Sequence, residues 1–437
     1  MTLSETRENR GQLLHILGVS FGIAIAIGGM IGAGILRTPS LIAGFVPDTR
    51  WILALWAFGA LHAALEANVV SELSTALPRA GGFYVYAHRA FGDVGGLVVG
   101  WTTWIARLCS SAALSVAFAD FLSILWPGVA HFTALVAAAM LGALFALNAI
   151  GLREGRSFQQ VTSLAKALAL AGFCVVAFVT AAPGAGTAAA PQVLAFTGSI
   201  AAYQLIVGAY AGWFEPAFFA EENTEPARSV PRAMFIGIAI AGFLYVAINA
   251  ALIHALGVAT VAHGALPYTT VLSRLAGRSA GALFAVGALV VVASCANAGF
   301  MAAPRVLLAL SRDGLLPGAL GNVNKGGSPY VAFLLTGVCA VALTLTGSFG
   351  LLFGLIGTLG MMSFVLTIAT IFVLRRREPE LARPYRAFGY PWLPAIVLVF
   401  DAALLLLFLN SNWWGALTAA ILWLICIPFA IVARRAR

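Results

Sequence analysis

The sequence predicts an all-α integral membrane protein with about twelve transmembrane helices. Of its 437 residues, 61% are hydrophobic and only 9% are charged, whereas soluble globular chains carry about 25% charged residues. Apolar runs long enough to cross a bilayer, about 20 residues each, recur along the whole chain, and glycines interrupt two of them near their centres. We therefore expect one membrane domain with two broken helices.

The expected crossings follow one another with short connections. They lie at about 16–45, 51–76, 95–125, 131–151, 158–181, 195–221, 231–257, 280–311, 329–347, 350–374, 390–410 and 413–433. The polar start, MTLSETRENRGQ, precedes an apolar segment without a small-residue cleavage site, which is not the pattern of a removable signal peptide. An even number of crossings places both termini on one side.

The basic residues indicate which side that is. On this map the side of the termini holds Arg7, Arg10, Arg79, Arg89, Arg153, Arg156, Arg228, Arg232, Arg305, Arg312, Lys325, Arg375–Arg377, Arg383, Arg386, Arg434, Arg435 and Arg437, and the opposite side holds Arg50, Arg274 and Arg278. Because Lys and Arg collect on the cytoplasmic side, we expect both termini in the cytoplasm. The net charge of +9 follows from this bias and does not call for a nucleic-acid partner.

The two interrupted runs have the same kind of break. The first crossing contains AIAIGGMIGAGILRTPS (24–40), with four glycines at its centre, and the sixth contains GAYAGWFEP (208–216), with Gly212, Glu215 and Pro216. Breaks five crossings apart predict two five-helix halves of inverted topology. We expect a tail at 1–14, repeats at 15–181 and 195–374, and two further helices with a short tail at 390–437.

A break at mid-membrane has a chemical use. The half-helix that starts near Gly34 offers free N–H groups to a carboxylate, and the half-helices that end near Gly28 and Ala209 offer carbonyl groups to an ammonium group. A zwitterion fits both. The alternative is close packing of helices through small residues, which is less favoured when two breaks occupy corresponding positions.

Longer motifs make the chain resemble a known family. ELSTALPRAGGFYVYAHRAFG (72–92) follows the second crossing, EENTEPARSVPRA (221–233) the sixth, SRDGLLP (311–317) the eighth and RRREPELARPYRAFGYPWLP (375–394) the tenth. With GGMIGAGIL in the first crossing, these resemble the amino acid-polyamine-organocation superfamily, particularly bacterial amino acid permeases and the related L-type amino acid transporters. The resemblance covers nearly the whole chain.

The resemblance implies a fold and a set of site residues. The fold would be leucine-transporter-like, with five plus five inverted repeats, discontinuous first and sixth helices, two additional helices and transport by alternating access. The implied substrate-binding residues are Ile27, Ile31, Gly32, Ala33, Gly34, Ala209, Tyr210, Gly212 and Asn297. Relatives often carry Ser in place of Ala33, and many carry a bulky aromatic gate in place of Gly208. We therefore expect gating by Trp213 or Phe214, or a larger pocket.

Lys166, in SLAKALALAGF (163–173), is an informative single residue. A lysine within hydrocarbon costs at least about 2.5 kcal/mol, so we expect it to face the protein interior. In the sodium-independent relatives a lysine here stands in place of the sodium ion and ties the fifth helix to the first, which implies transport without sodium. The alternative is a lysine that reaches the membrane surface from near a helix end.

Other buried ionisable residues allow more than one interpretation. Glu215 could attract a cationic substrate or exchange a proton. However, the family's polar position aligns with Phe214, and the alternative for Glu215 is a packing or hydrogen-bonding role. We expect His62, Glu66 and Arg107 to form a structural set. Asp120 and Asp401 lie nearer the predicted helix ends, and we expect both to be solvated.

The leading functional hypothesis is an amino acid transporter, working by proton symport or by exchange. The runner-up is a transporter of polyamines or other organic cations, for which Glu215 is the only positive sign. An enzyme would need convergent catalytic residues, whereas the six histidines are scattered, and a receptor would bind without flux. The five cysteines have no paired spacing and no nearby His or Cys, so we expect no metal site and no cofactor. The L-type relatives bind a partner through a cysteine in the loop after the third crossing. That loop here, WPGVAH (126–131), has no cysteine, so we expect no disulfide-linked partner.

Overall fold

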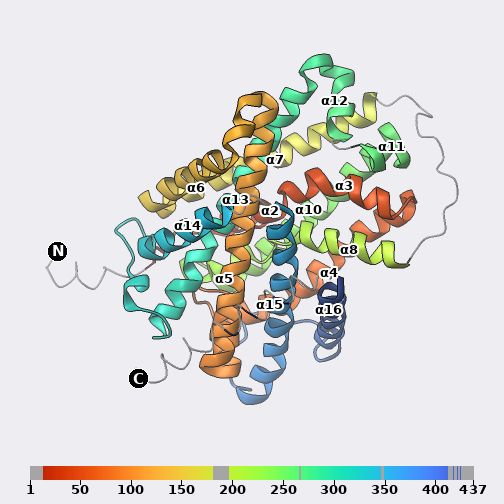
Figure 1. The fold of residues 1–437 in the computed structure, drawn as a ribbon. Coiled ribbons are helices and arrows are strands. Elements are labelled where there is room, and N and C mark those ends of the chain that lie inside the picture. The colour runs from red at the N-terminus through yellow and green to blue at the C-terminus, as the bar shows by residue number, and fades with distance from the viewer. Residues whose placement is uncertain are drawn as a thin grey trace.

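The computed structural model describes residues 13–180, 196–264, 267–345 and 349–411, together with Leu417, Ile421 and Leu424. These residues are almost entirely helical (Figure 1). The α-helices are α2 (Val19–Met30), α3 (Ala33–Phe45), α4 (Thr49–Ala76), α5 (Phe83–Leu125), α6 (Thr133–Ile150), α7 (Leu152–Thr180), α8 (Phe196–Tyr210), α9 (Glu215–Phe218), α10 (Pro226–Leu256), α11 (Val258–His263), α12 (Pro267–Ala276), α13 (Ala280–Arg312), α14 (Tyr330–Thr344), α15 (Phe349–Arg377) and α16 (Trp392–Ser411). The 3₁₀ helices are η1 (Pro127–Phe132), η2 (Ala220–Glu222), η3 (Gly277–Ser279) and η4 (Gly318–Gly321).

The helices have the length and composition of membrane crossings. Within the described ranges, 8 helices can span a bilayer, and α2 with α3 forms a further span bent by 43°. The shorter apolar helix α14 lies where the ninth crossing is expected, and α8, of 15 residues, lies in the first part of the expected sixth crossing. The expected twelfth crossing, 413–433, falls almost wholly outside the described residues. A multi-pass membrane protein is therefore confirmed, and the number twelve stays a prediction.

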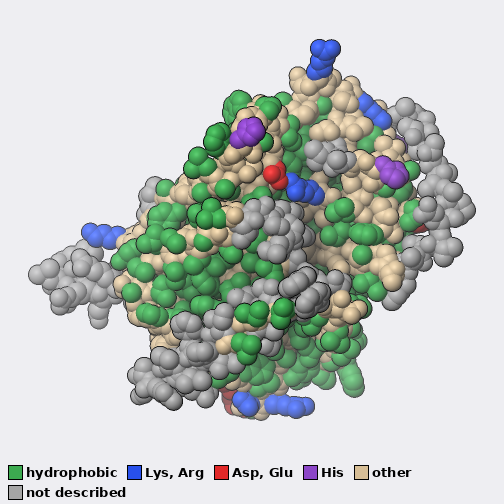
Figure 2. Space-filling model, viewed as in Figure 1, with side chains coloured by type: hydrophobic (Ala, Val, Ile, Leu, Met, Phe, Trp, Pro, Cys, Tyr) green, Lys and Arg blue, Asp and Glu red, His purple; other side chains and the backbone are tan. Residues whose placement is uncertain are grey.

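The longest helix, α5, runs through the middle of the molecule (Figure 1) and packs against α13 and α15. It is bent at Gly92, whose φ of 73° is not helical. The first half of the broken crossing, α2, packs against α7, α10 and α13. Side chains with almost no exposed surface fill the space between these helices. The outer flank is largely hydrophobic, with few charged side chains on the face shown in Figure 2.

Both predicted breaks are present. The chain leaves helical geometry at Ile31 and Gly32 between α2 and α3. The second break, at 211–214, separates α8 from the single turn of α9. Gly212 has a φ of +126°, which side-chain-bearing residues rarely adopt. The second part of the sixth crossing is thus shorter than expected, because α9 ends at Phe218 and η2 follows directly.

One connection is partly helical. The map assigns no crossing to the residues between 257 and 280, and the structure has the short helices α11 and α12 there. Pro267, Tyr268 and Val271 are buried on α12, while Arg274 on the same helix donates to the Ala255 carbonyl. The apolar positions are too few for a crossing but suffice to cover one helix face.

Loops that were expected on the cytoplasmic side meet at one end of the bundle. Arg79, after α4, pairs with Asp313, after α13, at 2.8 Å. Arg312 pairs with Glu221 at 2.6 Å, which joins the end of α13 to η2. Because these segments contact one another, they lie on the same side of the membrane, as expected. Which side of the membrane that end faces stays a prediction.

Candidate functional site

The two breaks touch each other. A Cβ atom added to Gly212 would lie 2.3 Å from the carbonyl carbon of Gly29, and one added to Gly29 would lie 2.9 Å from the Gly212 Cα. Any side chain at either position would force the two backbones apart. The glycines therefore allow the broken segments of the first and sixth crossings to pack backbone against backbone.

A cavity lies beside this contact. It has about 120 Å³ of water-accessible space, and its wall is mostly apolar, with the polar groups supplied chiefly by Arg107, Glu215, Gln204 and Ser110. A second cavity of about 70 Å³ shares Gly29, Gly208 and Cys295 with the first. The two form adjoining parts of one space around the breaks.

The N-terminus of α3 opens onto the smaller cavity. Gly32, Ala33 and Gly34 line that cavity, and no side chain caps the helix, which is 13 residues long. The first N–H groups of a helix have no partner within it and carry the positive end of its dipole. This end of the cavity is therefore suited to bind a carboxylate.

The carbonyl groups at the end of α2 are already paired with protein groups. Lys166 donates to the carbonyls of Gly28 at 2.8 Å and Ile31 at 2.7 Å, and Ile31 N–H donates to the Ile27 carbonyl at 2.9 Å. The Cys295 thiol lies 3.2 Å from the Gly29 carbonyl oxygen. The expected acceptors for an ammonium group thus have protein donors in this conformation.

Lys166 is 1% exposed, which contradicts the alternative of a side chain that reaches the membrane surface. Its two hydrogen bonds join α7 to the broken end of α2, as the resemblance implies. The ammonium group of a lysine has three N–H donors. Here it donates to carbonyl oxygens that a bound cation would otherwise coordinate.

Tyr245 on α10 connects the two breaks, and the sequence interpretation missed it. Its hydroxyl lies 2.7 Å from the Met30 carbonyl and 2.9 Å from the Ala209 carbonyl, at the last turns of α2 and α8. The side chain is fully buried. A lone tyrosine in the apolar run of α10 was the only signal in the sequence, and it does not reveal what the hydroxyl contacts.

Glu215 lines the larger cavity rather than pointing away from it. Its partner is Arg107, which we had expected to lie with His62 and Glu66. Arg107 donates from one Nη atom to both carboxylate oxygens, at 2.7 and 2.9 Å. Its guanidinium also lies over the rings of Phe218 and Phe214, at 4.1 and 5.4 Å. The Nε and second Nη atoms of Arg107 have no partner among the described residues.

The comparisons with known proteins bear on what this cavity holds. A family model described as amino acid permease matches residues 17–433. The chain belongs to the amino acid permease family. Members of this family are transporters rather than enzymes, and the family description and several relatives point to amino acid transport across a membrane.

Named relatives of this permease differ in substrate. It is 26% identical to the serine/threonine exchanger SteT of Bacillus subtilis, over 87% of this chain and 88% of that protein. It is also 26% identical to the branched-chain amino acid permease BcaP of the same organism, over 89% and 86%. The large neutral amino acids transporter small subunit 2 of Mus musculus is 26% identical, over 91% and 76%.

Some of the predicted binding residues of this permease line the two cavities, and others do not. Gly32, Ala33, Gly34, Ala209 and Gly212 line the two cavities. The predicted residues that line neither cavity are Ile27, Ile31, Tyr210 and Asn297. The backbone segments that line the cavities were therefore predicted better than the side chains that do so.

Asn297 is held in a separate polar network. Its amide donates to Gln159 at 2.8 Å and accepts from Asn148 at 2.8 Å. Cys295 and Gly299, on the same helix, line the larger cavity instead. Positions two residues apart on a helix face different directions, so a motif that locates the helix does not settle which of its side chains the cavity meets.

The two predicted gating aromatics occupy different places. Phe214 lines the larger cavity and contacts Phe83 and Phe364, with ring centroids 5.2 and 5.1 Å apart. Trp213 is buried behind the lining and stacks on Phe364 at 5.8 Å. Gating by either residue remains a prediction, and Phe214 is the one in contact with the cavity.

Two expectations about ionisable residues were wrong. Arg107 does not join His62 and Glu66, because it lies on the face of α5 that meets α9 and pairs with Glu215. Asp401 is not solvated, because it has no exposed surface and contacts His62 at 2.7 Å. Asp120 is partly exposed and pairs with Arg37. Long-range packing of α5 and α16 set these partners.

An ion pair between η2 and the spanning helix α13 supports the short α9–η2 segment. Glu222 binds Arg305 of α13 at 2.5 and 2.8 Å, and the Arg305 guanidinium lies 4.1 Å from the centroid of the Phe219 ring. Burial raises the pKa of the Glu222 carboxyl, while the Arg305 charge acts to lower it. The pair fixes the chain that follows the second break.

Proposed function

We propose that this permease is a sodium-independent secondary transporter of neutral amino acids, working across the cytoplasmic membrane as a proton symporter or an exchanger. The observation that carries this proposal is the uncapped N-terminus of α3 at a cavity between two broken helices. Such a site fits the carboxylate common to all amino acids. The named relatives transport amino acids with uncharged side chains.

Charge in the cavity supports neutral substrates over organic cations. Glu215 was the one sign of a polyamine substrate, and Arg107 already binds both of its oxygens. The pair has no net charge, and the remaining wall is mostly apolar. A polyamine would have to displace Arg107 and leave a guanidinium buried without its counter-ion, which costs several kcal/mol.

Lys166 supports sodium independence. Its ammonium group binds the carbonyls of Gly28 and Ile31 at the end of α2. A sodium ion at the same carbonyls would have to lie beside a positive charge. We propose that Lys166 holds the broken helix in the place where sodium would act, and that Glu215 contributes to coupling through its pair with Arg107.

We propose the architecture of the resemblance for the whole chain. It comprises a cytoplasmic tail at 1–14, inverted repeats at 15–181 and 195–374, and two further helices with a cytoplasmic tail at 390–437. The two breaks at corresponding positions support this arrangement. Alternating access would then open the cavity to one side of the membrane at a time, without a disulfide-linked partner.

The test is uptake into liposomes that contain the purified protein. Labelled serine, threonine, leucine and putrescine are offered with sodium or choline outside, with or without an inward proton gradient, and with or without unlabelled amino acid inside. We expect uptake of at least one amino acid at equal rates in sodium and choline, raised by the proton gradient or by internal amino acid. Strict sodium dependence, or uptake of putrescine alone, would overturn the proposal.

A further inference from the structure

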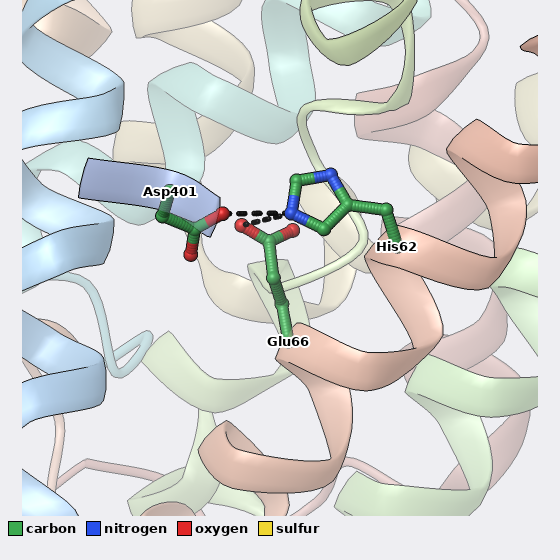
Figure 3. Close-up of side chains that lie close together, drawn as sticks. All are labelled: His62, Glu66 and Asp401. Atoms are coloured by element: carbon green, nitrogen blue, oxygen red, sulfur yellow. Dashed lines mark hydrogen bonds and ion pairs between the residues drawn. The ribbon is translucent and has the colours of Figure 1, made fainter. Parts of the chain in front are cut away.

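A cluster of three ionisable side chains lies apart from the cavity, at the junction of α4 and α16. It comprises His62 and Glu66 of α4 and Asp401 of α16 (Figure 3). Their relative exposures are 4%, 4% and 0%. Ionisable residues buried within a membrane protein are costly and usually functional, and neither the proposed substrate site nor the Lys166 contact uses them.

The distances within the cluster are those of hydrogen bonds rather than of metal coordination. His62 Nε2 lies 2.7 Å from an Asp401 oxygen and 3.9 Å from a Glu66 oxygen, and His62 Nδ1 lies 3.0 Å from the Tyr203 hydroxyl of α8. A metal ion bound between His62 and Asp401 would hold them farther apart, because each metal–ligand bond is about 2.0–2.2 Å. The separation of 2.7 Å is that of a hydrogen bond.

Two oxygen atoms of the cluster have no hydrogen-bond partner among the described residues, namely Glu66 Oε1 and Asp401 Oδ2. Both are buried. An ionised carboxylate only accepts hydrogen bonds, whereas a protonated one also donates. A proton on either carboxyl group would supply a donor that the cluster lacks.

Counting charges leads to the same conclusion. With all three groups ionised, two carboxylates face one imidazolium and leave a net negative charge buried away from water. The other titratable group in contact is Tyr203, with Tyr210 beyond it on α8, and α15 contributes the apolar Phe364 near Trp213. No second cation among the described residues faces the cluster. Because an uncompensated buried charge costs several kcal/mol, neutrality requires one additional proton.

The cluster is connected to the second break. The Trp213 indole, which is a donor only, acts on the Glu66 carboxyl as a neighbouring hydrogen-bond donor. On its other side Trp213 stacks on Phe364, which lines the larger cavity. Movement of the broken segment would therefore change the hydrogen bonding of Glu66.

We propose that His62, Glu66 and Asp401 form a proton-binding site that couples transport to pH, with Trp213 as its link to the substrate cavity. When substrate binding or release shifts Trp213, Glu66 loses its indole donor and the cluster binds its additional proton more tightly. When Trp213 returns, the indole favours the Glu66 carboxylate and the proton is bound less tightly. This inference rests on the proposed transport function and places its proton coupling at α4 and α16 as well as at Glu215.

The first test needs no substrate. Infrared difference spectra of the purified protein between about pH 8 and pH 5 report the C=O stretch of carboxyl groups that gain a proton. We expect a band that Glu66→Gln or Asp401→Asn removes and that Asp120→Asn, the matched change at a partly exposed aspartate, leaves in place. A spectrum that is the same in wild type, Glu66→Gln and Asp401→Asn would overturn the proposal.

Trp213→Phe keeps all three ionisable groups and so remains informative if the charge variants do not fold. It removes a donor to the carboxylate form, and hydrogen bonds to the charged form favour that form. We expect the midpoint of the infrared band to move to higher pH. An unchanged midpoint would show that Trp213 does not act on Glu66 and would overturn the link to the cavity.

The second test counts protons during substrate binding. Calorimetric titration with whichever of serine and leucine the liposomes accumulate, in two buffers of different ionisation enthalpy, gives the number of protons exchanged. We expect a non-zero number in wild type, a number near zero in Glu66→Gln, and the wild-type number in Asp120→Asn. A wild-type number of zero, or one that Glu66→Gln preserves, would overturn coupling. Absence of amino acid uptake would instead overturn the transport function, since the infrared test does not depend on it.

Discussion

The Lys166 ammonium nitrogen lies 2.7 Å from the Ile31 carbonyl oxygen, which places a positive charge at the break in the first crossing. The carbonyls at the end of a helix carry the negative end of its dipole. Lys166 thus stabilises the unwound backbone from α7, on a neighbouring helix. Both this side chain and the close approach that the glycines allow support the broken geometry.

Replacing this lysine should therefore disturb the break. Lys166→Met keeps an unbranched side chain but leaves the carbonyls of Gly28 and Ile31 without their donor, at about 1–3 kcal/mol for each buried group. We expect amino acid uptake to fall at least tenfold and the melting temperature in detergent to fall. Lys325→Met, at an exposed loop position, is the control, and wild-type uptake by Lys166→Met would contradict the role.

The hydroxyl of Tyr245 should matter more than its ring. Tyr245→Phe preserves packing against Trp56 and Tyr210 but removes the donor to Met30 and Ala209. We expect a loss of about 1–3 kcal/mol in stability and a larger fractional loss in transport rate, because the two breaks are no longer joined. Uptake and thermal unfolding are compared with Tyr330→Phe, an exposed tyrosine. Equal behaviour of the two variants would refute this role for the hydroxyl.

Removing one partner of the buried Arg107–Glu215 ion pair should lower the stability of the protein. Arg107→Met leaves Glu215 buried without its counter-charge, and removing one partner of such a pair costs about 3–5 kcal/mol. We expect Arg107→Met to unfold at lower temperature and Arg107→Met with Glu215→Gln to recover part of the loss.

The control for that prediction is an exposed ion pair. Arg89→Met breaks the contact with Glu378, in which the arginine side chain is 56% exposed, and exposed pairs contribute only about 0–1 kcal/mol. A double-mutant cycle measured by thermal unfolding gives the coupling energy. Additive losses at Arg107 and Glu215 would mean that the two side chains do not act as a pair.

The contact between the breaks should not tolerate a methyl group. Gly212→Ala adds a Cβ at 2.3 Å from a Gly29 backbone atom and places alanine at a φ of +126°. We expect uptake to be lost even where the protein still reaches the membrane. Gly172→Ala, in α7 with open space around the added methyl, should keep uptake. Full activity of Gly212→Ala would show that the breaks need not touch.

Apolar runs and glycine breaks predicted most of the helices and both interruptions, because membrane spans are long, local and strongly patterned. The breaks predicted where the cavity lies, and the family resemblance implied Gly32, Ala33 and Gly34, which line it. The site side chains were predicted less well. Asn297 lies two residues from Cys295, which does line the cavity. A sequence motif locates the helix but does not specify which of its faces turns toward the cavity.

The sequence by itself determined that the protein lies in a membrane, that its first and sixth crossings are broken, and that Lys166 is buried, since each follows from residues close together in the chain. Only the tertiary structure decided which charges meet. Arg107 pairs with Glu215 across 108 positions, and His62 pairs with Asp401 across 339. In a low-dielectric interior every charge needs a partner, and the packing of α5, α9, α4 and α16 chooses it.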